Sequence, residues 1–151
     1  HNVFDGIRIF EHLDDALALK PDICFICNPT SMHLETAIAV AESGCNLFIE
    51  KPLANRLDGI AHLEKLIREK NLVAFVGYQM RFHSLIQEAK KCIDESLIGN
   101  VIVAHFMNGE YLPDWHPYED YRQSYAGQKE LGGGVALTLS HEIDLIYHFF
   151  V

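Results

Sequence analysis

The chain has 151 residues, of which 49% are hydrophobic and 22% are charged, a composition typical of a globular protein and not of a disordered segment. Its twelve basic and twenty-one acidic side chains give a formal net charge of -9, which argues against nucleic acid or an anionic membrane as a partner. No apolar run approaches the length of a membrane span, and the first residues lack the basic and apolar regions of a signal peptide, so we expect a cytoplasmic protein.

The first half of the sequence alternates short apolar runs with segments of helical period. The predicted order is strand 7–10, helix 13–19, strand 23–27, helix 30–44, strand 47–49, helix 55–71 and strand 72–76. Apolar residues occupy both faces of the later runs, which is typical of strands buried in a parallel sheet. Thr30 or Ser31 could cap the long helix that ends at Gly44, and Asn55 with Asp58 three residues on predicts the start of the next helix.

The pattern changes near Gly77, and we place a domain boundary between residues 77 and 78. Beyond it we predict helix 83–96, strand 101–106, an irregular loop at 111–122 and helix 135–149. The loop carries five aromatic rings if His116 is counted, and such a loop is either a surface lid or a partner-contact arm. The glycine triplet at 132–134 would let the backbone approach a cofactor or sugar closely, and the alternative is a flexible loop before a helix.

The four cysteines are few and scattered, at positions 24, 27, 45 and 92. Cys24 and Cys27 lie in one predicted strand at an offset of three, which points their side chains to opposite faces. This arrangement indicates core cysteines instead of a zinc or redox site, and we expect no metal site.

Glu50 and Lys51 follow the apolar run 47–49 directly, and Pro52 marks where the chain leaves the sheet. They therefore lie at the carboxyl edge of a parallel strand, where open α/β sheets bind their ligands. A lysine half shielded by the sheet is a candidate general base, because partial desolvation lowers its pKa toward neutrality. The alternative is a solvated charge pair at a strand end.

Four motifs follow one another along the chain: Ile23-Cys-Phe-Ile-Cys-Asn-Pro-Thr-Ser-Met-His33, Phe48-Ile-Glu-Lys-Pro52, Gly77-Tyr-Gln-Met-Arg-Phe82, and Gly132-Gly-Gly leading to Ser140-His-Glu-Ile-Asp144. In this order and spacing they resemble the Gfo/Idh/MocA family of NAD(P)-dependent oxidoreductases, and they cover nearly the whole chain. The resemblance implies an α/β fold, with a partial Rossmann domain (a doubly wound parallel sheet) at residues 1–77. Residues 78–151 would then form part of an α+β substrate and oligomerisation domain.

The resemblance also implies NAD or NADP as the cofactor and a homo-oligomeric whole protein, a dimer or a tetramer. No Gly-x-Gly-x-x-Gly occurs in the chain, so the first βαβ unit with its phosphate-binding turn is expected upstream of residue 1. The residue that reads the cofactor ribose belongs to that region, and the choice between NAD and NADP is left open.

By resemblance, the loop from Asn28 to His33 lies against the nicotinamide half of the cofactor. The positions that the resemblance assigns to the cofactor are Asn28, Pro29, Thr30, His33, Glu50, Lys51, Pro52 and Arg81. Exposed backbone amides at a helix start suit a polar or anionic ligand, whereas a capped turn with an exposed His33 is the alternative. For Arg81 the alternative is a structural cation that holds the two domains together.

His141, Asp144 and His148 share one face of the last predicted helix. Asp144 could orient His141, all three could bind a metal, or His141 could be a buried core residue. The resemblance makes Lys51, His141 and Asp144 the catalytic residues and points His141 at the substrate hydroxyl. Inositol dehydrogenases of the family carry an aspartate four residues before this histidine, where this chain has Leu137. We therefore expect Lys51 and His141 to form the main pair.

The reaction that the resemblance implies is hydride transfer between a nicotinamide cofactor and a secondary alcohol of a sugar, cyclitol or nucleotide-sugar, with Lys51 taking the hydroxyl proton. The expected contacts to this carbohydrate-like substrate are Lys51, Arg81, Tyr111, Trp115, Tyr121, Arg122 and His141. Two rival functions remain. One is a metal-dependent hydrolase or lyase that uses the histidines at 116, 141 and 148 with Asp144, and the other is a non-catalytic sugar or cofactor sensor, which Leu137 favours.

Overall fold

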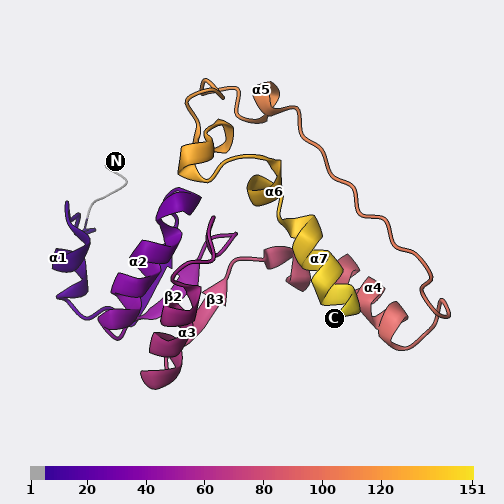
Figure 1. Cartoon of the computed structure of the whole chain (residues 1–151), viewed down its shortest axis with the longest axis horizontal. Coiled ribbons are helices and arrows are strands. Elements are labelled where there is room, and N and C mark those ends of the chain that lie inside the picture. Colours follow the sequence, from indigo (N-terminus) through magenta and orange to yellow (C-terminus); the bar gives the residue numbers. More distant parts are fainter. Residues whose placement is uncertain (1–5) are drawn as a thin grey trace.

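The computed structural model describes residues 6–151 of the chain (Figure 1). The elements are, in order, α1 (Leu13–Leu17), β1 (Ile23–Ile26), α2 (Thr30–Glu42), β2 (Asn46–Ile49), α3 (Ile60–Glu69), β3 (Ala74–Val76), the 3₁₀ turn η1 (Gln79–Phe82), α4 (Ser84–Asp94), α5 (Leu112–Trp115), the 3₁₀ turns η2 (Tyr125–Gly127) and η3 (Lys129–Leu131), α6 (Val135–Thr138) and α7 (His141–Phe150). None of these helices is long and apolar enough to cross a membrane.

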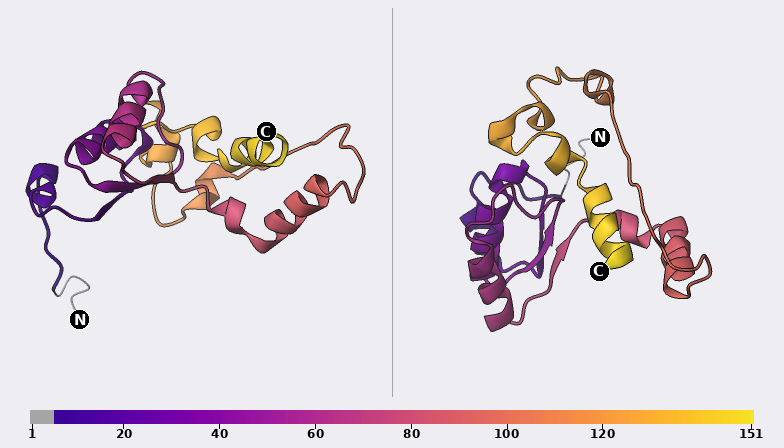
Figure 2. Two further views of the ribbon diagram at one scale, coloured as in Figure 1. Left: turned by 90° about the horizontal axis from the view of Figure 1, so that it is seen from below. Right: turned by 45° about the vertical axis from the view of Figure 1, so that its right-hand side comes forward.

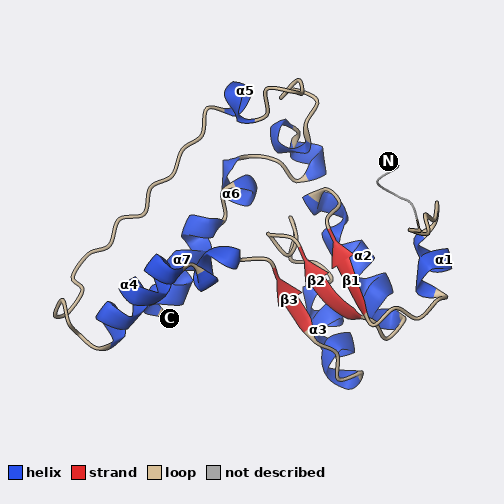
Figure 3. Ribbon diagram, turned by 180° about the vertical axis from the view of Figure 1, so that it is seen from behind, coloured by secondary structure: helices blue, strands red, loops and turns tan. Residues whose placement is uncertain are grey.

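The three strands form one parallel sheet in the order β1-β2-β3. Each strand connects to the next through a helix, α2 and then α3, and both helices lie against the same face of the sheet (Figure 3). Crossover connections of this kind are what parallel pairing requires. The predicted partial Rossmann fold is confirmed.

The core fills the space between the sheet and the two crossover helices. Leu47 and Ile49 of β2 point into it, and α2 contributes Leu34, Ala37 and Ala41 at helical spacing. Alanines on the buried face allow α2 to lie close to the sheet, so Leu47 and Ile49 of the central strand are almost completely buried.

The opposite face of the sheet carries a row of phenylalanines. Phe25, Phe48 and Phe75 come from the three strands in register, and Phe82 of η1 extends the row. Neighbouring ring centroids are 5.1, 5.5 and 5.9 Å apart. The sequence predicts strands that are buried on both faces, but within residues 6–151 this face is open, and Phe25 is 63% exposed. Figure 2 shows the helices gathered on the other side of the sheet.

Two predicted strands do not form. Residues 7–10 and 101–106 are extended without a ladder partner, and Ile9 and Ile102 are 73% and 97% exposed. An apolar alternating run is stable as a strand only when a neighbour satisfies its backbone groups and covers one of its faces. Residues 99–111 instead span the distance between α4 and α5 as an extended connection (Figure 1).

Two predicted helices differ in their bounds. The helix expected from Asn55 begins only at Ile60, because Gly59 adopts a left-handed conformation (φ +95°) that a helix cannot contain. The helix expected over 135–149 is two helices, α6 and α7, since Leu139 (φ -106°, ψ 48°) leaves the helical region. α7 then packs beside η1. Its C-terminal end is covered by Phe106, whose ring lies 5.9 Å from that of Phe149.

Candidate functional site

The carboxyl ends of β1 and β2 open into a cleft of about 190 Å³. Its walls are Cys27, Asn28, Pro29, Thr30, His33, Glu50, Lys51 and Tyr125. Six of the eight positions that the family resemblance assigns to the cofactor therefore lie around one cleft. The reason is topological, since β1 and β2 are adjacent and parallel and the segments that follow them emerge at the same edge of the sheet.

His33 connects the two walls of this cleft. Its side chain is 2% exposed, and its Nε2 and Nδ1 lie 2.8 Å from the carbonyl oxygens of Asn28 and Pro52. Asn28 follows β1 and Pro52 follows β2, so the imidazole holds the two strand ends together. Both ring nitrogens are used by the protein itself, and the alternative of an exposed His33 is wrong.

Lys51 lies at the centre of the site. Its Nζ donates a hydrogen bond of 2.6 Å to the carbonyl oxygen of Thr138, at the end of α6. Burial lowers the pKa of Lys51 below its ordinary value, and the negative charges of Glu50 and Glu142 oppose this shift. One N–H of the amine is fixed by the Thr138 carbonyl, which leaves the lone pair of the neutral amine free to accept a proton.

His141 is the first residue of α7, and its ring meets that of Tyr78 edge-on, with centroids 5.9 Å apart. Its Nδ1 is buried and has no hydrogen-bond partner among the described residues. Burial and the nearby charge of Lys51 both lower the pKa of His141, against smaller opposite effects of the acidic groups around it. A neutral imidazole beside a lysine is suited to accept or relay a proton near pH 7.

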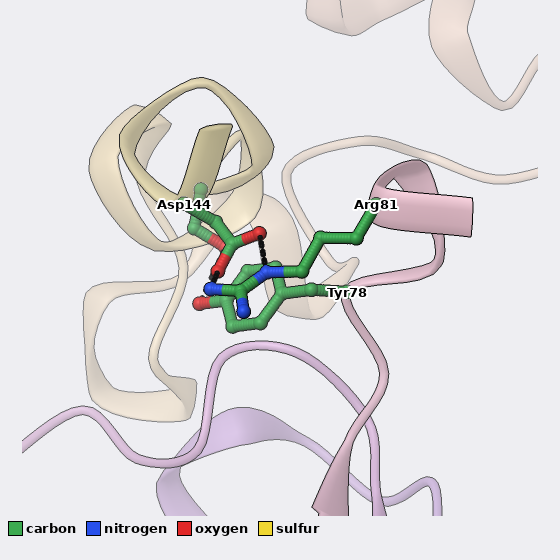
Figure 4. A network of polar contacts seen from close by, with 4 residues as sticks. Tyr78, Arg81 and Asp144 are labelled. Atoms are coloured by element: carbon green, nitrogen blue, oxygen red, sulfur yellow. Dashed lines mark hydrogen bonds and ion pairs between the residues drawn. The ribbon is translucent and has the colours of Figure 1, made fainter. Parts of the chain in front are cut away.

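Asp144 makes no hydrogen bond to His141 in the described part of the chain. Its two carboxylate oxygens accept hydrogen bonds from Arg81, with Nε to Oδ2 at 2.8 Å and Nη2 to Oδ1 at 2.5 Å (Figure 4). The possibility that a direct hydrogen bond from Asp144 orients His141 is therefore not realised among the described residues, because Asp144 pairs with the guanidinium fork of Arg81. Arg81 lies outside the cleft, in a depression formed by β3 with Tyr78 and Asp144.

The aromatic loop contributes none of its side chains to the cleft. Tyr111 is 71% exposed, and Arg122 lies over the ring of its neighbour Tyr121 at 4.8 Å. Trp115 lines a separate pocket of about 100 Å³ together with Thr138, whose carbonyl binds Lys51. Of the substrate contacts expected in this loop, Trp115 is thus the one that lies near the Lys51 site.

Tyr125 is a cleft residue that the sequence did not reveal. It belongs to η2 and faces Asn28, Glu50 and Lys51 from outside the sheet. Burial raises the pKa of its phenol, and the charges of Glu50 and Glu119 add to the effect, so the hydroxyl remains a hydrogen-bond donor at neutral pH. Residues 50 and 125 are far apart in the sequence, and no local pattern indicates that they lie together.

The glycine triplet explains how Tyr125 reaches the cleft. A Cβ on Gly132 would lie 2.8 Å from Cβ of Thr30, and one on Gly133 would lie 2.3 Å from the carbonyl oxygen of Tyr125. The triplet therefore brings its backbone against the first turn of α2 and against η2. The close approach predicted for these glycines is to the protein itself.

Residues 6–151 contain no group of three or more His, Cys, Asp or Glu side chains that could hold a metal ion. The histidine and aspartate set of α7 is not arranged as a ligand set, since Asp144 is engaged by Arg81. The geometry gives no support to the metal-dependent rival.

The Gfo/Idh/MocA family model, described as an oxidoreductase family with an NAD-binding Rossmann fold, matches residues 3–78, which is about half of the chain. The chain belongs to this family. The levoglucosan dehydrogenase of Pseudarthrobacter phenanthrenivorans is 34% identical over 122 residues, which cover 80% of this chain and 30% of that protein.

Two further Gfo/Idh/MocA comparisons extend over more of the chain. The 2,7-anhydro-N-acetylneuraminate hydratase of Escherichia coli is 29% identical over 128 residues, 84% of this chain and 33% of that protein. The crystal structure of the WlbA dehydrogenase from Bordetella pertussis, in complex with NADH and UDP-GlcNAcA, superimposes with a TM-score of 0.76 at 27% identity. It covers 96% of this chain and 42% of that chain. The chain therefore spans about a third of the length of its curated relatives.

The cleft fits the nicotinamide end of the cofactor named in the Gfo/Idh/MocA family description. It offers neutral polar groups at Asn28, Thr30 and Tyr125 beside the Lys51 ammonium, and the Oδ1 atom of Asn28 is buried without a partner in the described part of the chain. The ten glycines of the sequence nowhere form the Gly-x-Gly-x-x-Gly turn that binds a pyrophosphate. Residues 28–33 and 50–51 are thus the part of the chain that could hold a cofactor at this cleft.

Proposed function

We propose that the chain supplies the proton-transfer site of an NAD(P)-dependent dehydrogenase that acts on a secondary alcohol of a sugar, cyclitol or nucleotide-sugar. Residues 1–77 are the later part of a nucleotide-binding Rossmann domain, and residues 78–151 begin the substrate domain. The proposal rests on one observation above all: Lys51, at the carboxyl edge of β2, donates a hydrogen bond to the carbonyl of Thr138, three residues before His141 of the distant helix α7.

Lys51 is the proton acceptor in this proposal. Burial lowers its pKa, which favours the neutral amine, and the bond to the Thr138 carbonyl holds the amine in place. His141, neutral for the same reason of burial, receives or relays the proton. The bound nicotinamide supplies the hydride chemistry, and the residues of this chain hold and move the proton.

The named relatives support the substrate class. One acts on levoglucosan, and another was crystallised with NADH and a UDP-sugar. The third is a hydratase, whose overall reaction is not an oxidation. A test must therefore separate net oxidation of an alcohol from hydration of a sugar derivative.

The test is to incubate the whole protein with NAD⁺ or NADP⁺ and a panel of levoglucosan, inositols, UDP-sugars and 2,7-anhydro-N-acetylneuraminate. We expect reduction of the nicotinamide, followed by its absorbance, with at least one alcohol of the panel. Product formation from the anhydro sugar without net reduction would assign a hydratase. Binding of the cofactor without either reaction would assign the non-catalytic sensor.

Oligomeric state and compartment belong to the same proposal. We propose a cytoplasmic homo-oligomer, a dimer or a tetramer. Light scattering of the purified whole protein measures the first property, and cell fractionation the second.

A further inference from the structure

The start of α7 is held by the segment that follows β3. Arg81 binds Asp144 with two hydrogen bonds, and the hydroxyl of Tyr78 lies 3.5 Å from Oγ of Ser140. The ring of Tyr78 also packs edge-on against His141. All three contacts fall on residues 140–144, the N-cap and the first turn of α7, and Figure 4 shows Arg81 and Tyr78 beside Asp144.

The same segment is tied to the strand that carries Lys51. The N–H of Gly77 donates to the carbonyl of Ile49 at 2.8 Å, two residues before Lys51. Arg81 is four residues beyond Gly77. The backbone hydrogen bond from Gly77 to β2 and the ion pair from Arg81 to α7 thus together fix the position of His141 relative to Lys51.

The ion pair between Arg81 and Asp144 is suited to hold α7 in position because it is directional and partly buried. The side chain of Asp144 is 7% exposed, whereas that of Arg81 is 35% exposed. A guanidinium that donates in parallel to both oxygens fixes orientation as well as distance, which an ammonium cannot do. A buried carboxylate without its cation would be unfavourable, so the pair also resists separation of α7 from η1.

We propose that Arg81 and Asp144 are a positioning pair, which orients His141 toward Lys51 and touches neither substrate nor cofactor. This inference rests on the proposed function. It replaces two expectations from the family resemblance, namely that Asp144 is catalytic and that Arg81 contacts the ligands.

The test uses Asp144→Asn and Arg81→Lys in the whole protein. Asparagine keeps the size of the side chain but loses its charge, and lysine keeps the charge but loses the fork. Each variant should lower kcat roughly 10- to 100-fold with KM and cofactor Kd changed less than about threefold, because misplacement of a proton-transfer group affects the chemical step. The double variant should be no slower than the slower single variant within about a factor of three, since both remove one contact.

The matched control is the ion pair between Arg68 and Glu64 on the outer face of α3, which has the same residue chemistry but is exposed. Glu64→Gln and Arg68→Lys should leave kcat unchanged. Wild-type kcat in Asp144→Asn, or a loss that only follows a fall in the folded fraction, would overturn the positioning role. Additive losses in the double variant would overturn it as well.

A readout without turnover separates this inference from the proposed function. The titratable groups around the His141 ring are Tyr78, which packs edge-on against it, and four charged residues that act on its pKa, namely Lys51 and Glu50 after β2 and Glu142 and Asp144 on α7. NMR titration of the ring should show a changed chemical shift and a lower pKa in Asp144→Asn, because a negative charge and the fixed orientation are lost together. An unchanged titration would overturn the inference even in an active enzyme. If the wild type turns over nothing on the panel, the proposed function fails, and a changed titration still supports the pair.

Discussion

Burial lowers the pKa of both Lys51 and His141, and the charge of Lys51 lowers the pKa of His141 further. The single hydrogen bond from Lys51 to Thr138 does not replace the solvation that a fully exposed ammonium would have. At the residue scale, the site therefore favours the uncharged forms that a proton acceptor needs. Deprotonation of either group should raise the rate of alcohol oxidation, so the rate should increase with pH through the lowered pKa values and fall below them.

Lys51→Ala should reduce kcat for alcohol oxidation by a factor on the order of 10² to 10⁴ with cofactor affinity little changed, because the residue acts on the proton and not on the dinucleotide. Steady-state kinetics with cofactor titration measures both effects. Lys70→Ala is the control, since Lys70 also donates to a backbone carbonyl, that of Glu42, but on the exposed surface. Retention of most turnover in Lys51→Ala would exclude it as the main proton acceptor.

At the scale of elements, the fit between the glycine triplet and α2 decides the shape of the cleft. Gly132 adopts φ +85°, and its backbone touches the first turn of α2 at Thr30. Tyr125 is held through the next glycine, so the wall of the cleft depends on two positions without a side chain.

Gly132→Ala should destabilise the protein by more than Gly44→Ala. Both glycines have almost the same left-handed backbone, with φ +85° and +84°, but Gly44 has nothing within 4 Å of an added Cβ. The left-handed conformation alone costs about 1–2 kcal/mol for alanine, and the contact with Thr30 should add about 1–3 kcal/mol, the usual effect of overpacking. Denaturant unfolding of the whole protein measures the difference. Equal values for the two variants would show that Thr30 moves away without cost.

At the scale of the whole molecule, the sheet has one covered and one open face. The strand β1 also lies at an edge of the sheet formed by residues 6–151. An open apolar face next to an unpaired edge is the combination that promotes association between copies.

Residues 1–151 expressed alone should bind NAD(H) and NADP(H) too weakly to support turnover, and should aggregate or oligomerise. The first expectation follows from the missing pyrophosphate turn, and the second from the open face with Phe25 and Phe75. Calorimetric titration and light scattering measure the two properties. Phe25→Lys with Phe75→Lys should reduce association, whereas Ile102→Lys, at a position exposed away from the sheet, is the control. A monodisperse monomer with micromolar cofactor affinity would contradict this prediction.

The sequence by itself determined the sheet and the position of Lys51. The runs at 23–27, 47–49 and 72–76 are local patterns, and their order with intervening helices leaves parallel crossover pairing as the consistent arrangement. Adjacent parallel strands bring their following loops together, so the cleft between Asn28 and Lys51 could be predicted before any coordinates.

Only the tertiary structure decided which partners the functional side chains take. Asp144 is three residues from His141 but pairs with Arg81, 63 residues away in sequence, because packing of α7 on η1 brings a guanidinium to its oxygens. The helix expected over 135–149 is interrupted after Thr138, and the carbonyl of Thr138 accepts a hydrogen bond from Nζ of Lys51. Helical periodicity reports only which residues share a face, and a hydrogen bond between elements far apart in the chain depends on how those faces meet.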